Sequence, residues 1–228
     1  MEVGNGPLCA AKEHVAERGL ESVIETRLSD GLHNYIIGEA DTLICAGMGG
    51  RLMMRILSDD REKTVSFREL ILQPQSEIEQ FRRWLRRQGY CITDENMIEE
   101  DGKFYPMMRV RTDAEKRGDQ VCGYEEICKE LIDRQPHSYE RTTARLNNIC
   151  NIADRNILCK LMDRYGPFLL LYKNNALAVY LKREEKIYGE ILDNLLAKGL
   201  SDEKRKNRYT EVMKLMGECR MALEIVIS

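Results

Sequence analysis

The sequence predicts an α/β protein with a mainly parallel sheet, crossover helices and a helical C-terminal part. Helix and strand patterns alternate over residues 7–111, which is typical of parallel strands joined by crossover helices. An Asp101-Gly102 turn between two strand-like stretches then indicates an antiparallel hairpin at the edge of the sheet. A heptad repeat near the C-terminus indicates a pair of packed helices.

Local signals define the elements of the N-terminal half. Pro7 and Gly19 bound a first helix, because proline suits a first helical turn and glycine suits a stop. The stretch SVIETRL (22–28) alternates as a strand does, and Asp41–Cys45 is a second, apolar strand that leads into a helix. RELILQPQ (68–75) is a third strand.

The next helix carries a group of arginines. Ser76 and Glu79 predict a capping box at its start, and Gly89 predicts its end. Four basic side chains lie away from its apolar stripe: Arg82, Arg83, Arg86 and Arg87. A solvated helix face is the simpler interpretation of these arginines, and a face that contacts phosphates is the alternative.

The C-terminal half lacks strand signals. Residues 112–164 are charged and helical in pattern, with a mild basic excess from 134 to 164. A helix over 177–198 is followed by a second helix whose apolar residues repeat with heptad spacing: Tyr209, Val212, Met216, Cys219, Leu223 and Val226. We therefore expect a sheet domain (1–111), a helical insertion (112–164) and a C-terminal helical hairpin (165–228).

Composition excludes several classes of protein. The formal net charge is -3, which does not indicate a nucleic-acid-binding protein but does not exclude a local basic face. The eight cysteines form no CxxC pair and the three histidines are far apart, so no metal site is expected. No signal peptide and no long apolar run is present. The expectation is a reduced cytoplasmic protein with no membrane segment.

Three stretches lie where an open parallel sheet binds ligands, at the carboxyl ends of its strands. They are Glu2 before a glycine-rich turn, Asp30-Gly31, and the AGMGG stretch at 46–50. Each also has a simpler interpretation: a solvated terminal acid, an ordinary Asp-Gly turn, and a tight strand-to-helix turn. Neither the phosphate-loop pattern nor GxGxxG fits the glycines of AGMGG.

The order of these stretches resembles a known family. EVGNGP, SDGL, EADTLICAGMGG, LILQP, RRWL and EEDGKFYP, followed by GPFLLLYKNNALAVYLKREEKIY, are similar to the bacterial tRNA adenine-N1 methyltransferases that modify adenosine 22. The resemblance covers about residues 2–111 and 165–228. It implies a Rossmann-like class I methyltransferase sheet, S-adenosylmethionine as methyl donor, and a C-terminal coiled-coil-like helical domain that helps to engage tRNA.

The resemblance also implies roles for individual residues. Glu2 would hold the ribose of the cofactor, Asp30 and Gly31 would line its adenine, and Ala46, Gly47 and Met48 would lie beside its methionine end. The positions expected to border the incoming base or the RNA are Gly49, Gly50, Gln73, Pro74, Arg83, Lys103 and Tyr105. No metal is implied, and the sequence does not define an oligomeric state.

The chain departs from the family pattern at several points. Gln75 stands where the family has asparagine, Pro106 stands where it usually has glutamate, and residues 115–164 resemble an insertion. The family's first strand and its acidic glycine-containing loop have no counterpart, so the resemblance assigns no catalytic residue. We therefore expect a sheet that lacks its first strands and a chain truncated at its N-terminus, for which the genomic sequence upstream of Met1 is the test.

The implied reaction is transfer of a methyl group to N1 of adenine 22 in tRNA. The ring nitrogen has its own lone pair, so positioning would supply much of the rate, and the base must leave its stack to react. The alternative is a non-catalytic RNA-binding or assembly protein derived from a methyltransferase. A nicotinamide-dependent oxidoreductase is not favoured, because its glycine fingerprint is missing.

Overall fold

The structure, a computed structural model, describes residues 1–112, 124–133 and 155–227. Four strands form one sheet in the order β1-β2-β4-β3. They span Thr42–Met48 (β1), Glu69–Pro74 (β2), Cys91–Glu100 (β3) and Lys103–Arg111 (β4). β1 and β2 are parallel, whereas β4 runs antiparallel to both of its neighbours. The predicted parallel pair and the predicted edge hairpin around Asp101-Gly102 are both confirmed.

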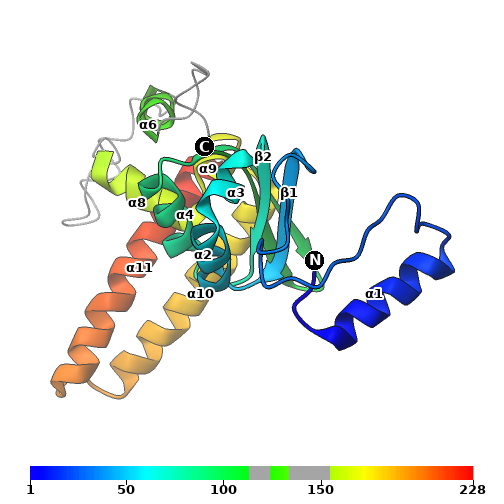
Figure 1. The fold of residues 1–228 in the computed structure, drawn as a ribbon. Coiled ribbons are helices and arrows are strands. Elements are labelled where there is room, and N and C mark those ends of the chain that lie inside the picture. The colour runs from blue at the N-terminus through cyan, green and yellow to red at the C-terminus, as the bar shows by residue number, and fades with distance from the viewer. Residues whose placement is uncertain (113–123, 134–154, 228) are drawn as a thin grey trace.

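The helices of the described residues divide between the two halves of the chain (Figure 1). Those of the first half are α1 (Asn5–Glu17), α2 (Gly50–Asp59), α3 (Arg61–Ser66) and α4 (Ile78–Arg87). Those of the second half are α6 (Tyr124–Asp133), α8 (Arg155–Tyr165), α9 (Pro167–Leu171), α10 (Asn175–Ala197) and α11 (Glu203–Ile227). The predicted boundaries of the parts at 111 and 164 stay predictions.

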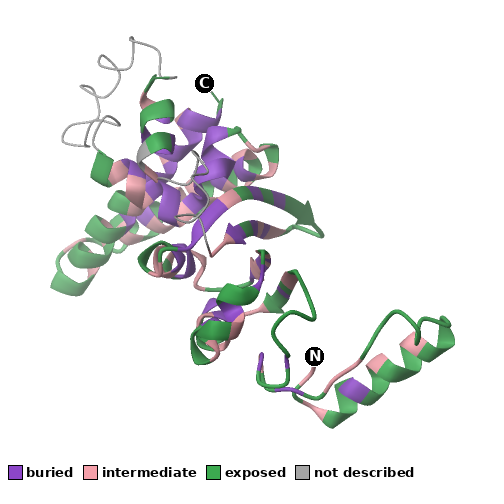
Figure 2. Ribbon diagram, turned by 45° about the horizontal axis from the view of Figure 1, so that its top comes forward, coloured by how far each residue is buried: buried purple, intermediate pink, exposed green. Residues whose placement is uncertain are grey.

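The sheet has one covered face and one open face. Leu70, Leu72 and Val110 are fully buried on the covered face, and α2, α3, α4 and α8 lie on that side in Figure 1. Residues between them along the strands point the other way, so burial alternates along β2 and β4 (Figure 2). On the open face of β1, Ile44 is 71% exposed.

The N-terminal segment corrects one prediction. Residues 22–28 do not form a strand, and within the part of the chain that the structure describes their β pairing is limited to a parallel bridge between Glu2 and Leu28. An alternating pattern becomes a strand only when a neighbour satisfies its backbone groups, and here Val23 is 73% exposed. The segment is anchored further on by Tyr35, which is buried and stacks on Phe67 with 4.5 Å between ring centroids.

The arginines of α4 correct a second prediction, because Arg82 does not face solvent. Its side chain is 1% exposed and its Nε donates to Oε1 of Glu95 on β3 at 2.8 Å. Arg82 Nη1 also donates to the carbonyl of Arg164 at 3.1 Å. Arg86 Nη2 donates to Asp163 of α8 at 2.7 Å. Arg83 Nε also lies 3.5 Å from Asp163 Oδ2, so three of the four arginines fasten α4 to β3 or α8.

The C-terminal helices form the predicted antiparallel hairpin. α10 packs against α11, and the predicted seam residues Val212, Cys219, Leu223 and Val226 are buried. Glu184 of α10 ties the base of this hairpin together, because it accepts hydrogen bonds from three tyrosine hydroxyls at 3.0–3.1 Å: those of Tyr165, Tyr180 and Tyr188.

The same hairpin is fastened to the tip of the β3–β4 hairpin. Arg183 Nη1 donates to the carbonyl oxygen of Gly102 at 2.6 Å. The Phe104 and Tyr180 rings meet edge to face with 5.2 Å between centroids. Beyond these contacts α10 and α11 extend away from the sheet (Figure 1).

Candidate functional site

The candidate residues gather at the end of the sheet where β1 and β2 terminate. Ala46 pairs with Gln73 across these two strands, and Leu72 pairs with Met108 of β4. Because β4 is antiparallel to β2, its first residues lie at this same end. Side chains alternate along a strand, so Gln73 and Tyr105 both lie on the open face. This is the position at which open parallel sheets bind ligands.

A hydrogen bond between the backbone of Gly47 and the side chain of Gln73 organises the site. The Gly47 amide donates to Gln73 Oε1 at 2.9 Å. Gly47 has a φ of +78°, and a Cβ placed on it would meet nothing within 4 Å, so its backbone is open on that side. A position that requires a left-handed backbone conformation is best occupied by glycine, which has no Cβ.

The same hydrogen bond leaves the other end of the Gln73 carboxamide without a partner. Its Nε2 atom is buried and makes no hydrogen bond with any described residue. A buried donor without an acceptor costs about 1–3 kcal/mol, and such groups are typical of sites that a ligand completes. The Oε1 atom of Gln73 is thus held by the Gly47 amide, and its Nε2 atom remains as a donor for a ligand.

Close packing explains why the next two residues, Gly49 and Gly50, are glycines. The Gly50 amide donates to the carbonyl oxygen of Ser76 at 3.1 Å, and a Cβ on Gly50 would lie 2.7 Å from that oxygen. A Cβ on Gly49 would lie 2.8 Å from Ser76 Oγ. The two strand-to-helix turns therefore touch, and only small residues fit between them. The contacts with substrate predicted for Gly49 and Gly50 stay predictions.

The predicted capping box of α4 is wrong. The N-cap residue is Glu77, which has a φ of 49° and makes no side-chain cap. The Ser76 hydroxyl bonds to the Glu77 carboxylate, and Glu79 pairs with Arg83 at 2.5 Å. The helix begins one residue later than the box requires, and both predicted capping side chains have other partners.

Glu2 and Asp30 lie at the ends of the two bridged N-terminal segments. Glu2 Oε1 accepts the amides of Val3 at 2.9 Å and Gly4 at 3.3 Å, while its Oε2 has no partner among the described residues. Asp30 Oδ1 accepts Arg55 Nη2 of α2 at 3.2 Å. The structure therefore holds Asp30 against the helix that begins at the candidate site.

Gly31 completes this contact. It has a φ of +59°, and a Cβ on it would lie 3.2 Å from the side chain of Ile56 on α2.

The last residues of β1 and β2 are held by the backbone and by burial. The carbonyl oxygen of Met48, at the end of β1, accepts the Gln75 amide at 2.9 Å. Pro74 is buried at the end of β2.

Of the remaining residues predicted to border the substrate, some lie at this end of the sheet and one does not. Lys103 and Tyr105 begin β4, where Lys103 is exposed and Tyr105 is half-buried. Arg83, by contrast, pairs with Glu79 on its own helix and with Asp163 on α8 at 3.5 Å. The structure brings Tyr105 towards the site but commits Arg83 elsewhere.

Arg51 is a cation at this end of the sheet that sequence reasoning missed. It follows AGMGG directly, at the start of α2, and its side chain is 83% exposed. Its Nε lies 3.6 Å from Glu77 Oε1. The sequence could have indicated this residue, because it follows the glycines directly and residues that begin a helix at a strand end often face a ligand.

Two other kinds of chemistry near these residues would be a nucleophilic thiol and a metal site. Burial raises the pKa of the Cys45 thiol to about 11, and its sulfur lies 3.5 Å from Met48 Sδ. A thiol with a raised pKa is a poor nucleophile. No group of three or more His, Cys, Asp or Glu that could hold a metal occurs within residues 1–112, 124–133 and 155–227.

Two further findings concern the whole of the described chain. Five cysteines of the described residues are free thiols: Cys9, Cys45, Cys128, Cys159 and Cys219. No described helix combines the length and the apolar character needed to cross a membrane.

Comparison with known proteins places this geometry in a class. Residues 1–108 match the family model described as a methyltransferase domain. The crystal structure of the Bacillus subtilis m1A22 tRNA methyltransferase TrmK aligns with a TM-score of 0.66 and 27% identity, over 97% of this chain and 80% of that one. The fold is that of a Rossmann-like methyltransferase domain with a helical C-terminal part.

The relatives define the class more narrowly. The tRNA (adenine(22)-N(1))-methyltransferase of Bacillus subtilis (strain 168) is 38% identical over 126 residues, which are 55% of this chain and 51% of that protein. The chain thus spans about half the length of the curated relative that it matches. The structure of M. capricolum TrmK in complex with S-adenosyl-homocysteine shares the fold, with a TM-score of 0.65 and 19% identity over 98% of this chain and 79% of that one. In sequence and fold the chain is similar to these tRNA (adenine(22)-N(1))-methyltransferases, in agreement with the resemblance of its motifs.

Proposed function

We propose that this chain acts in the S-adenosylmethionine-dependent methylation of N1 of adenine 22 in tRNA. The observation that carries the proposal is the Gly47–Gln73 hydrogen bond at the carboxyl ends of β1 and β2. It combines an open backbone position with a buried, unpaired donor where this fold binds its ligands. A tRNA substrate would place the protein in the cytoplasm.

The residues present fit the cofactor in part. The free Oε2 of Glu2 can accept a ribose hydroxyl, and the open side of Gly47 allows close approach of a ligand to the backbone. Asp30 would line the adenine while it keeps its ion pair with Arg55. When bound, S-adenosylmethionine would supply a methyl group on its sulfonium.

The protein's own contribution to the reaction would be positioning. Adenine N1 attacks with a lone pair that is already available, so no strong base is required before attack. A donor at N1 would block that attack, and we therefore expect Gln73 Nε2 to bind the carboxylate of the cofactor. Tyr105 on the open face would border the base after it leaves its stack.

The first test is direct binding of S-adenosylmethionine, measured by calorimetry with the chain as it is. The proposal predicts micromolar binding that weakens about tenfold in Gln73→Met, because one hydrogen bond from a buried amide is lost. Gln80→Met is the matched control, since Gln80 is an exposed glutamine of α4. Equal affinities of the two variants would contradict the role of Gln73.

The second test concerns the substrate. Incubation with radiolabelled S-adenosylmethionine should methylate a tRNA transcript that has adenosine at position 22 and should leave a transcript with guanosine there unlabelled. Label at adenosines other than 22 would contradict the proposed specificity.

The alternative function is a non-catalytic RNA-binding or assembly protein. The observation in its favour is that β1 is an edge strand, and no other part of the described chain pairs with its outer edge. This alternative predicts tRNA binding without binding of S-adenosylmethionine. Calorimetry and an RNA-binding assay on one preparation therefore separate the two functions.

A further inference from the structure

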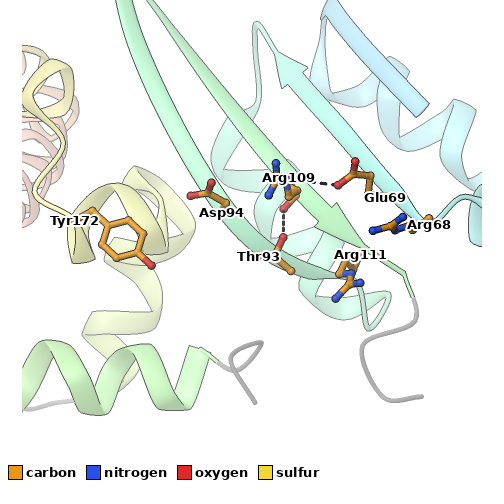
Figure 3. A pocket seen from close by; sticks show the side chains of 7 residues that line it. All are labelled: Arg68, Glu69, Thr93, Asp94, Arg109, Arg111 and Tyr172. Atoms are coloured by element: carbon orange, nitrogen blue, oxygen red, sulfur yellow. Dashed lines mark hydrogen bonds and ion pairs between the residues drawn. The ribbon is translucent and has the colours of Figure 1, made fainter. Parts of the chain in front are cut away.

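A second hollow lies on the open face, at the opposite end of β2 from the candidate site (Figure 3). Its volume is about 580 Å³, and we call it the arginine pocket. Seven residues line it: Arg68 just before β2, Glu69 at the start of β2, Thr93 and Asp94 of β3, Arg109 and Arg111 of β4, and Tyr172 just after α9. This volume lies within the range of about 300–1,000 Å³ that is usual for ligand pockets.

Arginines outnumber acids in the lining of the arginine pocket, with three guanidinium groups against two carboxylates. Glu69 Oε1 accepts the Thr42 hydroxyl at 3.3 Å, and Oε2 lies 3.6 Å from Arg109 Nε. Asp94 Oδ1 accepts the backbone amide of Glu95 at 2.9 Å. The formal charge of the lining is therefore positive.

Arg68 is the most available of these cations. Its side chain is exposed and makes no hydrogen bond or ion pair with any part of the chain that the structure describes. Its backbone is nevertheless fixed, because its amide donates to the Asp41 carbonyl at 2.8 Å. Arg109, whose side chain is 55% exposed, lies on the same open face and keeps part of its donors free. Guanidinium groups of this kind bind phosphate oxygens through paired donors.

Tyr172 supplies an aromatic surface on the other side of the pocket (Figure 3). It is 62% exposed, which is unusual for so large an apolar ring. Its inner side rests on Phe168, with 5.7 Å between ring centroids, so the ring is supported while much of it remains open. A supported, exposed ring beside exposed guanidinium groups is the combination on which single-stranded nucleic acids bind, with bases on the ring and phosphates on the cations.

We propose that the arginine pocket binds an unpaired nucleotide of the RNA substrate, with its phosphate at Arg68 and Arg109 and its base on Tyr172. The identification of the ligand as RNA rests on the proposed function, whereas the pocket itself does not. β2 connects the two sites over about 17 Å of strand, taking about 3.3 Å per residue. The nucleotide in the arginine pocket would thus lie several positions from the base at the methyl-transfer end.

The test compares two arginine variants that lose the same charge. Binding of a fluorescein-labelled tRNA transcript is measured by anisotropy over a series of KCl concentrations for Arg68→Gln and Arg87→Gln. Arg87 is the matched control, because it is an exposed arginine of α4 with no partner among the described residues. We expect Arg68→Gln alone to lower the slope of log affinity against log salt by about 0.7–0.9, the value for one lost phosphate contact.

The aromatic part is tested by a second pair of variants. Tyr172→Ala should weaken tRNA binding at least fivefold, because loss of one stacked base costs roughly that much or more. Tyr172→Phe retains the ring and should bind as the parent does. Thermal unfolding of each variant establishes that the loss is not one of folding.

Three results would overturn the inference. They are a salt slope for Arg68→Gln equal to that of the parent protein, an unchanged affinity in Tyr172→Ala, and saturation of the pocket by AMP with no effect of AMP on tRNA binding. The last result would identify a site for a free nucleotide instead.

The two proposals fail in different ways. If the chain binds S-adenosylmethionine and the pocket variants bind tRNA normally, only the arginine pocket is wrong. If tRNA binding depends on Arg68 and Tyr172 but S-adenosylmethionine does not bind, only the proposed methylation is wrong.

Discussion

The buried ion pair between Arg82 and Glu95 leads to a specific prediction about stability. The Arg82 side chain is 1% exposed and that of Glu95 is 0% exposed, with 2.8 Å between Nε and Oε1. Glu95 Oε2 also accepts the Phe168 amide at 3.1 Å, so the pair joins α4, β3 and α9. Removal of one partner of such a pair leaves an uncompensated buried charge, which costs about 3–5 kcal/mol.

We therefore expect Arg82→Met to lower the free energy of unfolding by about 3–5 kcal/mol in urea titrations. The double variant Arg82→Met/Glu95→Leu should recover most of this loss, because it removes the second charge as well. A loss below about 1 kcal/mol in the single variant, or no recovery in the double one, would refute the reasoning.

The pH dependence of the same variant provides a second measurement. Burial raises the pKa of Glu95, and the opposing effects of the Arg82 charge and hydrogen bond are smaller. Without Arg82 this pKa should rise further. A raised folded-state pKa means that the folded protein binds the proton more tightly than the unfolded chain does. The stability of Arg82→Met should thus increase as the pH falls through the folded-state pKa of Glu95, and should level off below the unfolded value near 4.3.

Three further predictions concern the glycines and the tyrosine cluster. Gly50→Ala should cost about 1–3 kcal/mol in urea titrations, because its Cβ would lie 2.7 Å from the carbonyl oxygen of Ser76; a neutral substitution would contradict the close contact of the turns. Gly47→Ala meets no atom within 4 Å but must keep a φ of +78°, so we expect a smaller cost of about 1–2 kcal/mol in the same assay. Burial and then the Glu184 charge raise the pKa of Tyr188 to about 12. Glu184→Gln should lower this pKa in NMR titrations of isotope-labelled tyrosine, and an unchanged value would mean that burial alone sets it.

Local signals in the sequence were sufficient for elements whose partners are close along the chain. The Asp101-Gly102 turn defined a hairpin because its two strands pair with each other. The heptad positions from Val212 to Val226 defined a helix seam because one connection brings α10 and α11 together. In both cases the pattern and the partner lie in the same stretch of sequence.

Elements that depend on distant partners could not be derived in this way. SVIETRL has the alternation of a strand, but without a neighbouring strand it remains irregular. Arg82 resembles its three neighbouring arginines in sequence, and only the position of Glu95 on β3 decides that it is buried. A single chain does not reveal which distant carboxylate will meet which arginine.

The candidate site shows the same division. The AGMGG and QP stretches predicted where β1 and β2 end, because strand ends can be read from the sequence, and a binding site at that end stays a prediction. The Gly47–Gln73 hydrogen bond joins residues 26 positions apart and depends on strand register, which sequence patterns did not specify. The arginine pocket is similar, because Arg68, Arg109 and Tyr172 come from three separate segments.

The attachment of the helical hairpin has a consequence for its reach. Arg183 contacts Gly102 near the base of α10, and the fourteen residues from there to Ala197 extend about 21 Å at 1.5 Å per residue. Adding or removing one heptad in each helix would move the far end by about 10 Å without altering any contact at the base. The reach of the helical hairpin and the arrangement of residues at the strand ends can therefore change independently of each other.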